Sequence, residues 1–149
     1  METLFEVVKV KQVLNEVNHP YARFTIRSPE DAAAVATHEI GDEDREIFLV
    51  IVLNTKNQVI AIHRCHAGSN NASIVHPRDV FKTAILNNAT SIVVSHQHPS
   101  GDPFPSSEDI DVTKRLRDAG TVLGIQVLDH VIVTHDKTKF HSLKEQGYL

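Results

Sequence analysis

The sequence predicts a single α/β domain in which helices flank one mixed β-sheet. The chain has 149 residues, a length that suits one domain with one hydrophobic core. Short apolar segments of strand length alternate along it with amphipathic segments of helical period. Hydrophobic residues make up 41% of the chain and charged residues 23%, as in ordinary soluble proteins. These observations favour a folded α/β protein over a disordered or fibrous one.

Residues 1–27 form a lead-in to the predicted domain, which spans residues 28–149. Apolar and charged residues alternate loosely over residues 2–13, so we expect an edge strand at most in this segment. The stretch Ser28-Pro29-Glu30-Asp31 supplies an N-cap, a proline at the first helical position and acidic residues in the first turn. These signals predict a helix that ends near Gly41.

The next segments predict a β-hairpin followed by a helix. Residues 47–53 are continuously apolar, so we expect a strand buried on both faces. Turn residues 54–57 lead into a second strand over residues 58–66, and Gly-Ser-Asn-Asn at 68–71 closes the hairpin. Apolar positions at helical spacing within residues 76–88 predict the helix.

The C-terminal half continues the alternation of strands and helices. The predicted elements are a strand over 91–98, a loop over 99–105, a helix from Ser106 to about Ala119 stopped by Gly120, strands over 125–128 and 131–134 separated by Asp129-His130, and a last helical turn within 142–149. No repeat or interdomain linker interrupts the pattern, so one domain remains the prediction.

Charge and cysteine content limit the possible partners and compartments. The formal net charge of -4 provides no global attraction to nucleic acid, so we expect no strong direct binding to it. The single cysteine, Cys65, excludes an intramolecular disulfide and suits a reducing compartment. The N-terminus lacks the apolar run of a signal peptide, and no run approaches the roughly 20 residues of a membrane helix. We therefore expect a cytoplasmic protein without a membrane partner.

Metal-ligand residue types gather where the strand over 91–98 meets the following helix. His96 and His98 are two residues apart, so both side chains lie on one face of a strand. Asp109, about one turn into the next helix, can complete a set of three ligands and leave a fourth position to water, as in catalytic zinc sites. The histidine pair and the pair of Ser106 with Asp109 each have a simpler interpretation. Histidine pairs at this spacing occur by chance, and Ser106 with Asp109 can form a capping box.

Taken together, the pattern resembles the JAMM (MPN+) metalloprotease motif, which is His-x-His, seven residues, Ser, two residues, Asp. The Pro-Ser-Gly-Asp-Pro that follows His98 is similar to the RadC branch of that family. The resemblance covers roughly residues 28–149, with Gln97 where the branch usually has Asn. We expect the Gln97 side chain to point away from the metal ligands. RadC-type proteins typically carry an N-terminal helix-hairpin-helix segment that these residues do not include, which weakens an expectation of DNA binding.

The resemblance implies a JAMM/MPN fold of the cytidine-deaminase-like type and a zinc-dependent hydrolase. One zinc ion per chain would be held by His96, His98 and Asp109, with an activated water on the open position. Glu46 would act as the general base, with Glu43 as the fallback. The family chemistry implies a peptide or an isopeptide-linked protein as substrate.

Ser106 would stabilise the oxyanion, in addition to capping the helix. Two further groups have no assigned role at this point. His63, Cys65 and His66 form a small cluster that we interpret as polar residues of the hairpin. His130 follows Asp129, whose carboxylate could orient the imidazole ring.

The main alternative function is a RadC-type accessory or scaffold domain linked to DNA repair without direct catalysis. MPN domains that lack the metal ligands serve as scaffolds, whereas all three ligands are present in this sequence. Zinc deaminases are excluded because they need a Pro-Cys-x-x-Cys pair, and this chain has one cysteine.

Overall fold

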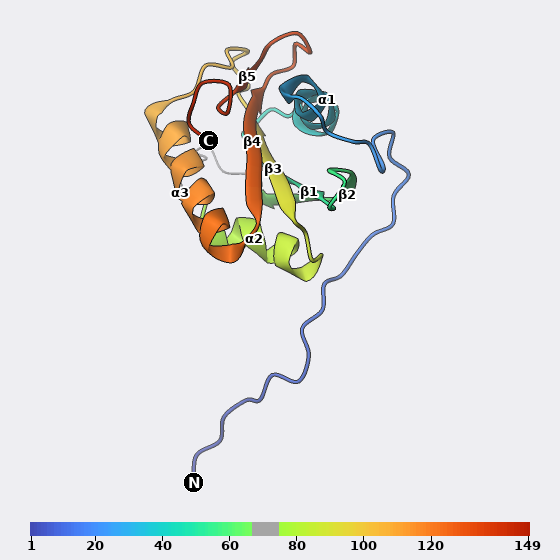
Figure 1. Cartoon of the computed structure of the whole chain (residues 1–149), viewed down its shortest axis with the longest axis vertical. Coiled ribbons are helices and arrows are strands. Elements are labelled where there is room, and N and C mark those ends of the chain that lie inside the picture. The colour runs from blue at the N-terminus through green and yellow to red at the C-terminus, as the bar shows by residue number, and fades with distance from the viewer. Residues whose placement is uncertain (67–74) are drawn as a thin grey trace.

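A mixed β-sheet forms the centre of the computed structural model, which describes residues 1–66 and 75–149 (Figure 1). The elements in these two ranges are α1 (Pro29–Ile40), β1 (Phe48–Leu53), β2 (Val59–His66), α2 (Pro77–Leu86), β3 (Ser91–Gln97), α3 (Ser107–Leu123), β4 (Gln126–Val133) and β5 (Phe140–Ser142). The strand order is β2-β1-β3-β4-β5. The expected turn at residues 68–71 lies outside the described residues.

Strand direction makes the sheet mixed, as the sequence predicts. β1 pairs antiparallel with both β2 and β3, and β5 pairs antiparallel with β4. β3 and β4 are parallel, and α3 makes the crossover between them. The predicted α/β class with a mixed sheet flanked by helices is therefore confirmed.

Helices cover both faces of the sheet, with α1 on one side and α2 and α3 on the other (Figure 1). Successive residues of a strand point to opposite faces, and β1 follows this rule. Phe48, Val50 and Val52 pack in the core under α2 and α3, whereas Leu49 and Ile51 pack under α1. All six residues of β1 are buried, which confirms a strand covered on both faces. Among the described helices, none is long and apolar enough to cross a bilayer.

The N-terminal segment differs from the prediction. Residues 1–19 form neither helix nor strand, so the expected edge strand over residues 2–13 is wrong. The outer edge of β2 is instead met by the chain just before α1, where Thr25 bridges Gln58. Val59 exchanges backbone hydrogen bonds with this segment, since its N–H donates to the carbonyl of Phe24. The outer edge of β2 is therefore already hydrogen-bonded at its first residue.

α3 continues past the predicted stop. Gly120 lies inside the helix and does not end it. A glycine is needed there because a Cβ would collide with the carbonyl oxygen of Ile125 and lie close to the ring of Phe81. The helix ends at Gly124, which adopts φ 73° in the left-handed region and caps the last turn. The glycine at 120 serves close packing, and the one at 124 serves termination.

β4 is one continuous strand where two were expected. Its register against β3 shifts between Ile92 and Val93, so that Leu128 forms a β-bulge. Asp129 and His130 are buried within the strand. The Asp129 carboxylate does not orient the His130 ring as considered above. It accepts hydrogen bonds from the backbone N–H of His130 and from the Ser142 hydroxyl, both at 2.7 Å.

The expected helical turn within residues 142–149 is also wrong. Residues 140–142 form β5, and residues 143–147 make turns. Leu143 is fully buried, and the backbone N–H of Lys144 donates to Asp129 at 3.2 Å. The buried carboxylate thus fixes the chain in a turn where local sequence favours a short helix.

Candidate metal centre

His96 and His98 lie at the carboxyl end of β3 with their imidazole rings together. The His96 side chain is fully buried, and that of His98 is 15% exposed. Their Nε2 atoms are 3.1 Å apart. The strand geometry therefore brings the two predicted ligands to one point, as the spacing of two residues requires.

Asp109 joins the two histidines from the first turn of α3. Its Oδ1 lies 3.2 Å from the Nε2 of His96, and its Oδ2 lies 3.3 Å from the Nε2 of His98. A capping box holds the carboxylate in place, because the backbone N–H of Ser106 donates to Oδ2 at 2.9 Å. The capping role and the contact with the histidines therefore coexist in one side chain.

Glu46 completes the group from the loop between α1 and β1. Its Oε1 lies 3.9 Å from the Nε2 of His96 and 3.8 Å from that of His98. Burial raises the pKa of its carboxyl, and the two histidines oppose this effect in part. The fallback base, Glu43, is bound elsewhere, since its Oε1 accepts from Arg64 at 2.7 Å. The structure thus brings Glu46 to the histidines and ties Glu43 to β2.

The hydrogen bond behind His98 fixes which ring nitrogen carries its proton. Nδ1 lies 2.8 Å from the backbone carbonyl oxygen of Asp102, and a carbonyl can only accept. Nδ1 of the neutral ring therefore carries the hydrogen. The Nε2 lone pair of His98 faces Asp109.

A longer chain of hydrogen bonds fixes His96 in the same way. The hydroxyl of Thr113 donates to the backbone carbonyl of Asp109 at 2.8 Å, so it accepts from Nδ1 of His130 at 2.6 Å. Burial holds the pKa of His130 well below its usual value, so this ring is neutral. Its Nε2 then accepts from Nδ1 of His96 at 2.9 Å. The Nε2 lone pair of His96 also faces Asp109.

This arrangement places four hydrogen-bond acceptors against one another. They are the two Nε2 lone pairs and the two oxygens of Asp109, and such a group needs a cation between its members. A proton is one such cation. Burial lowers the pKa of His98, but hydrogen bonds to Asp109 and Asp102 outweigh it and raise that pKa. The same histidines hold the pKa of Asp109 far below its usual range despite burial. Two nitrogens and a carboxylate also fit the ligand preference of zinc.

The remaining predicted residues lie outside this group or at its margin. Ser106 caps α3, and its Oγ accepts from the N–H of Asp109 at 3.1 Å, so its oxyanion role stays a prediction. His63 pairs with the hydroxyl of Thr83. Burial raises the pKa of the Cys65 thiol to about 12, which leaves it un-ionised at neutral pH. The side chain of His66 lies outside the described residues.

Two residues that support His96 through hydrogen bonds could not be assigned this role from sequence patterns. Thr113 lies at an ordinary position in α3, and its role depends on its contact with His130 of β4, a residue distant in sequence. His130 was a candidate without a role, and the structure places it behind His96. The available signal for His130 was its position on the strand that pairs with β3, where it lies opposite Val94 in the parallel register.

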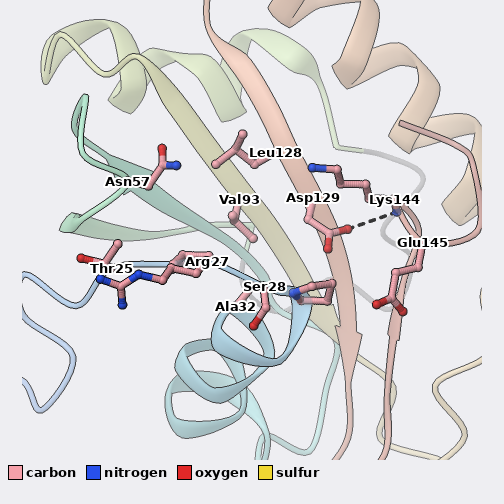
Figure 2. A pocket seen from close by; sticks show the side chains of 12 residues that line it. Thr25, Arg27, Ser28, Ala32, Asn57, Val93, Leu128, Asp129, Lys144 and Glu145 are labelled. Atoms are coloured by element: carbon pink, nitrogen blue, oxygen red, sulfur yellow. Dashed lines mark hydrogen bonds between the residues drawn. The ribbon is translucent and has the colours of Figure 1, made fainter.

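A separate cavity of about 660 Å³ lies between α1, β3, β4 and the C-terminal turn (Figure 2). Asp129 points into it and binds the backbone N–H of Lys144. Arg27 and Lys144 line the cavity together with Asp129 and Glu145, so both signs of charge are present. The cavity shares no lining residue with the group around His96.

Comparison with known proteins identifies the family of this chain. The profile of the RadC-like JAB domain family matches residues 26–148. A UPF0758 protein of Geobacillus sp. is 55% identical over 127 residues, which cover 85% of this chain and 55% of the relative. A UPF0758 protein of Desulfitobacterium hafniense is 52% identical over 130 residues, covering 87% of this chain and 56% of the relative. The chain spans about half the length of these curated relatives. It belongs to the RadC-like JAB domain family.

Proposed function

We propose that this chain is a zinc-dependent hydrolase, a metallopeptidase or isopeptidase that acts on peptide or isopeptide-linked protein substrates. The observation that supports it is the set of four acceptors formed by His96, His98 and Asp109, which calls for a cation. These three residues would hold one zinc ion per chain. Three protein ligands are typical of catalytic zinc, whereas structural zinc has four.

When bound, zinc supplies a Lewis acid that polarises a carbonyl group and lowers the pKa of water to about 7. The carboxylate of Glu46 lies beside both imidazoles and pairs with no lysine or arginine within the described residues. We assign it the transfer of the proton from the attacking water to the leaving amine. The Ser106 hydroxyl accepts from the backbone of Asp109 and retains its own hydrogen to donate to the developing oxyanion.

Glu46→Gln tests this assignment. We expect the variant to keep one zinc per chain and its fold, and to lose turnover by about 10²-fold or more, because general acid–base catalysis contributes about that much. The substrate would be found by screening peptide libraries and isopeptide-linked protein pairs. Glu43→Gln is the matched control and should retain turnover. Full turnover by Glu46→Gln would contradict the mechanism.

The scaffold alternative gives a different result in the same experiment. Stoichiometric zinc without turnover on any screened substrate would favour an accessory role over catalysis. A DNA titration at about 150 mM salt completes the comparison, since a net charge of -4 predicts weak, non-specific binding. Submicromolar affinity would favour the alternative linked to DNA repair.

A further inference from the structure

The side chain of Gln97 is fully buried and binds the backbone of the loop that carries Glu46. Its Oε1 accepts from the N–H of Ile47 at 2.8 Å. Its Nε2 donates to the carbonyl oxygen of Arg45 and, at 3.4 Å, to that of Glu43. One amide group thus holds the chain on both sides of Glu46.

This loop has few other backbone partners. Residues 43–47 belong to no helix or strand, so the ladders of the sheet do not fix them. Connecting segments of this kind are mobile unless something holds them. With the flanking peptides of Glu46 bound to Gln97, the freedom left to Glu46 is mainly that of its own side chain.

Gln97, which holds the loop like a clamp, comes from the same stretch of chain as the two histidines. Gln97 lies between His96 and His98, and adjacent residues of an extended chain point to opposite sides. The expectation that Gln97 points away from the histidines agrees with its bonds to the loop. β3 therefore sets the position of Glu46 relative to both imidazoles through one short stretch of backbone.

We propose that Gln97 is a positioning residue, which fixes the loop so that the carboxylate of Glu46 stays beside His96 and His98. The inference rests on the proposed function, in which Glu46 moves the proton. A misplacement of about 1 Å in a reacting group can cost on the order of 10²-fold in rate, so such a clamp bears directly on turnover.

The chemistry of the amide makes the role specific. Glutamine offers a donor and an acceptor on one group, as the N–H of Ile47 and the carbonyl of Arg45 require. Leucine has a similar volume and neither function. Asparagine keeps both functions on a side chain shorter by one methylene group.

The experiment compares Gln97→Leu with Ser95→Ala in the zinc-loaded chain. Ser95 is also fully buried in β3, but its hydroxyl donates to Val131 and not to the loop. We expect Gln97→Leu to speed hydrogen exchange at the Ile47 amide, to keep one zinc per chain, and to lower kcat about 10-fold or more with little change in KM. Ser95→Ala should leave the exchange and the kcat unchanged.

A double variant separates positioning from a general structural effect. In the Glu46→Gln background, Gln97→Leu should cause no further loss of turnover, because it acts through Glu46. If Gln97→Leu does not fold, Gln97→Asn provides the same readouts with a smaller expected change. Unchanged exchange at Ile47, or an additive loss in the double variant, would overturn the proposal. Absence of turnover in the wild type would instead overturn the proposed function, and the exchange at Ile47 still tests the clamp.

Discussion

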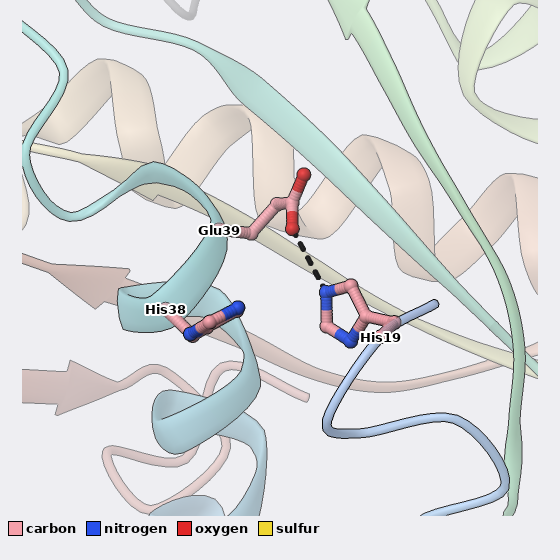
Figure 3. Close-up of side chains that lie close together, drawn as sticks. All are labelled: His19, His38 and Glu39. Carbon is pink, nitrogen blue, oxygen red and sulfur yellow. Dashed lines mark hydrogen bonds and ion pairs between the residues drawn. The ribbon is translucent and has the colours of Figure 1, made fainter. Parts of the chain in front are cut away.

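Two clusters of histidine and carboxylate occur in the described residues, and they differ in the direction of their hydrogen bonds. The second cluster consists of His19, His38 and Glu39 (Figure 3). The N–H of Tyr21 donates to Nδ1 of His19 at 3.1 Å, so the Nε2 of His19 carries the hydrogen and donates to Glu39 at 3.0 Å. In the candidate metal centre, the groups bonded to the Nδ1 atoms accept, so the Nε2 atoms of His96 and His98 present lone pairs.

The hydrogen bonds of the second cluster are complete without a metal ion. Glu39 also accepts from Arg64 at 3.4 Å, so protein donors face its carboxylate. His38 packs edge-on against His19, with ring centroids 5.0 Å apart. We interpret this cluster as a tether between the segment before α1 and the helix itself. The same residue types thus give a candidate metal centre or a structural contact, according to whether the group bonded to Nδ1 accepts or donates.

The largest expected difference between the clusters is in metal content. Asp109→Asn should bind well under one zinc per chain, because it removes an anionic ligand and offers an N–H to the Nε2 lone pairs. Glu39→Gln should keep one zinc per chain and lose about 1 kcal/mol of stability at most, as is usual for partly exposed ion pairs. Elemental analysis and denaturant unfolding measure both. Loss of zinc in Glu39→Gln would reverse the comparison.

A smaller effect is expected from the group behind His96. Thr113→Val removes the acceptor for His130, which then no longer fixes the ring of His96. Zinc affinity should fall about 10- to 100-fold, the usual effect of losing such a supporting contact. Thr121→Val is the matched control, because Thr121 is an exposed threonine of the same helix whose hydroxyl donates to the carbonyl of Arg117. Competition with a chelator measures the affinities, and equal values would exclude the role of Thr113.

The smallest effect is the pH dependence of stability. The pKa of His98 is raised in the folded chain, so without metal its contribution to stability is complete below the unfolded value of about 6.5 and is lost as pH rises through the folded value. Zinc competes with the proton, so zinc affinity should rise over the same range. Unfolding of chelator-treated protein between about pH 5.5 and 8 tests this. A profile flat in the wild type would contradict this expectation.

Local sequence patterns predicted the elements whose ends and burial depend on neighbouring residues. The Ser28-Pro29 start gives α1, and the unbroken apolar run gives β1, as observed. The end of α3 was misplaced because Gly120 is required by contact with Ile125, five residues ahead. Residues 142–149 were misjudged because their turn depends on the buried carboxylate of Asp129.

The candidate metal centre shows the same division between local and distant signals. The spacing of His96, His98 and Asp109 is a local signal, and the structure brings all three together with Glu46. The supporting residues act through pairs distant in sequence, such as Gln97 with the loop and Thr113 with His130. Nothing in the neighbourhood of Thr113 distinguishes it from any other helical threonine. Residues that hold a ligand in place therefore escape a search based on ligand spacing.

The bulge at Leu128 gives this chain a place where its length can change. Val127 and His130 lie on the α2 and α3 side of the sheet, whereas Val131 lies on the α1 side. With no bulge, strict alternation over the same residues would carry His130 into the layer under α1 and bring Val131 behind His96. Deletion of Leu128 has no such effect, because Asp129 and His130 would then follow Val127 in the register that already pairs them with Val93 and Val94. A one-residue deletion at the bulge should therefore be tolerated better than one beyond His130, which would reverse the facing of the rest of the strand.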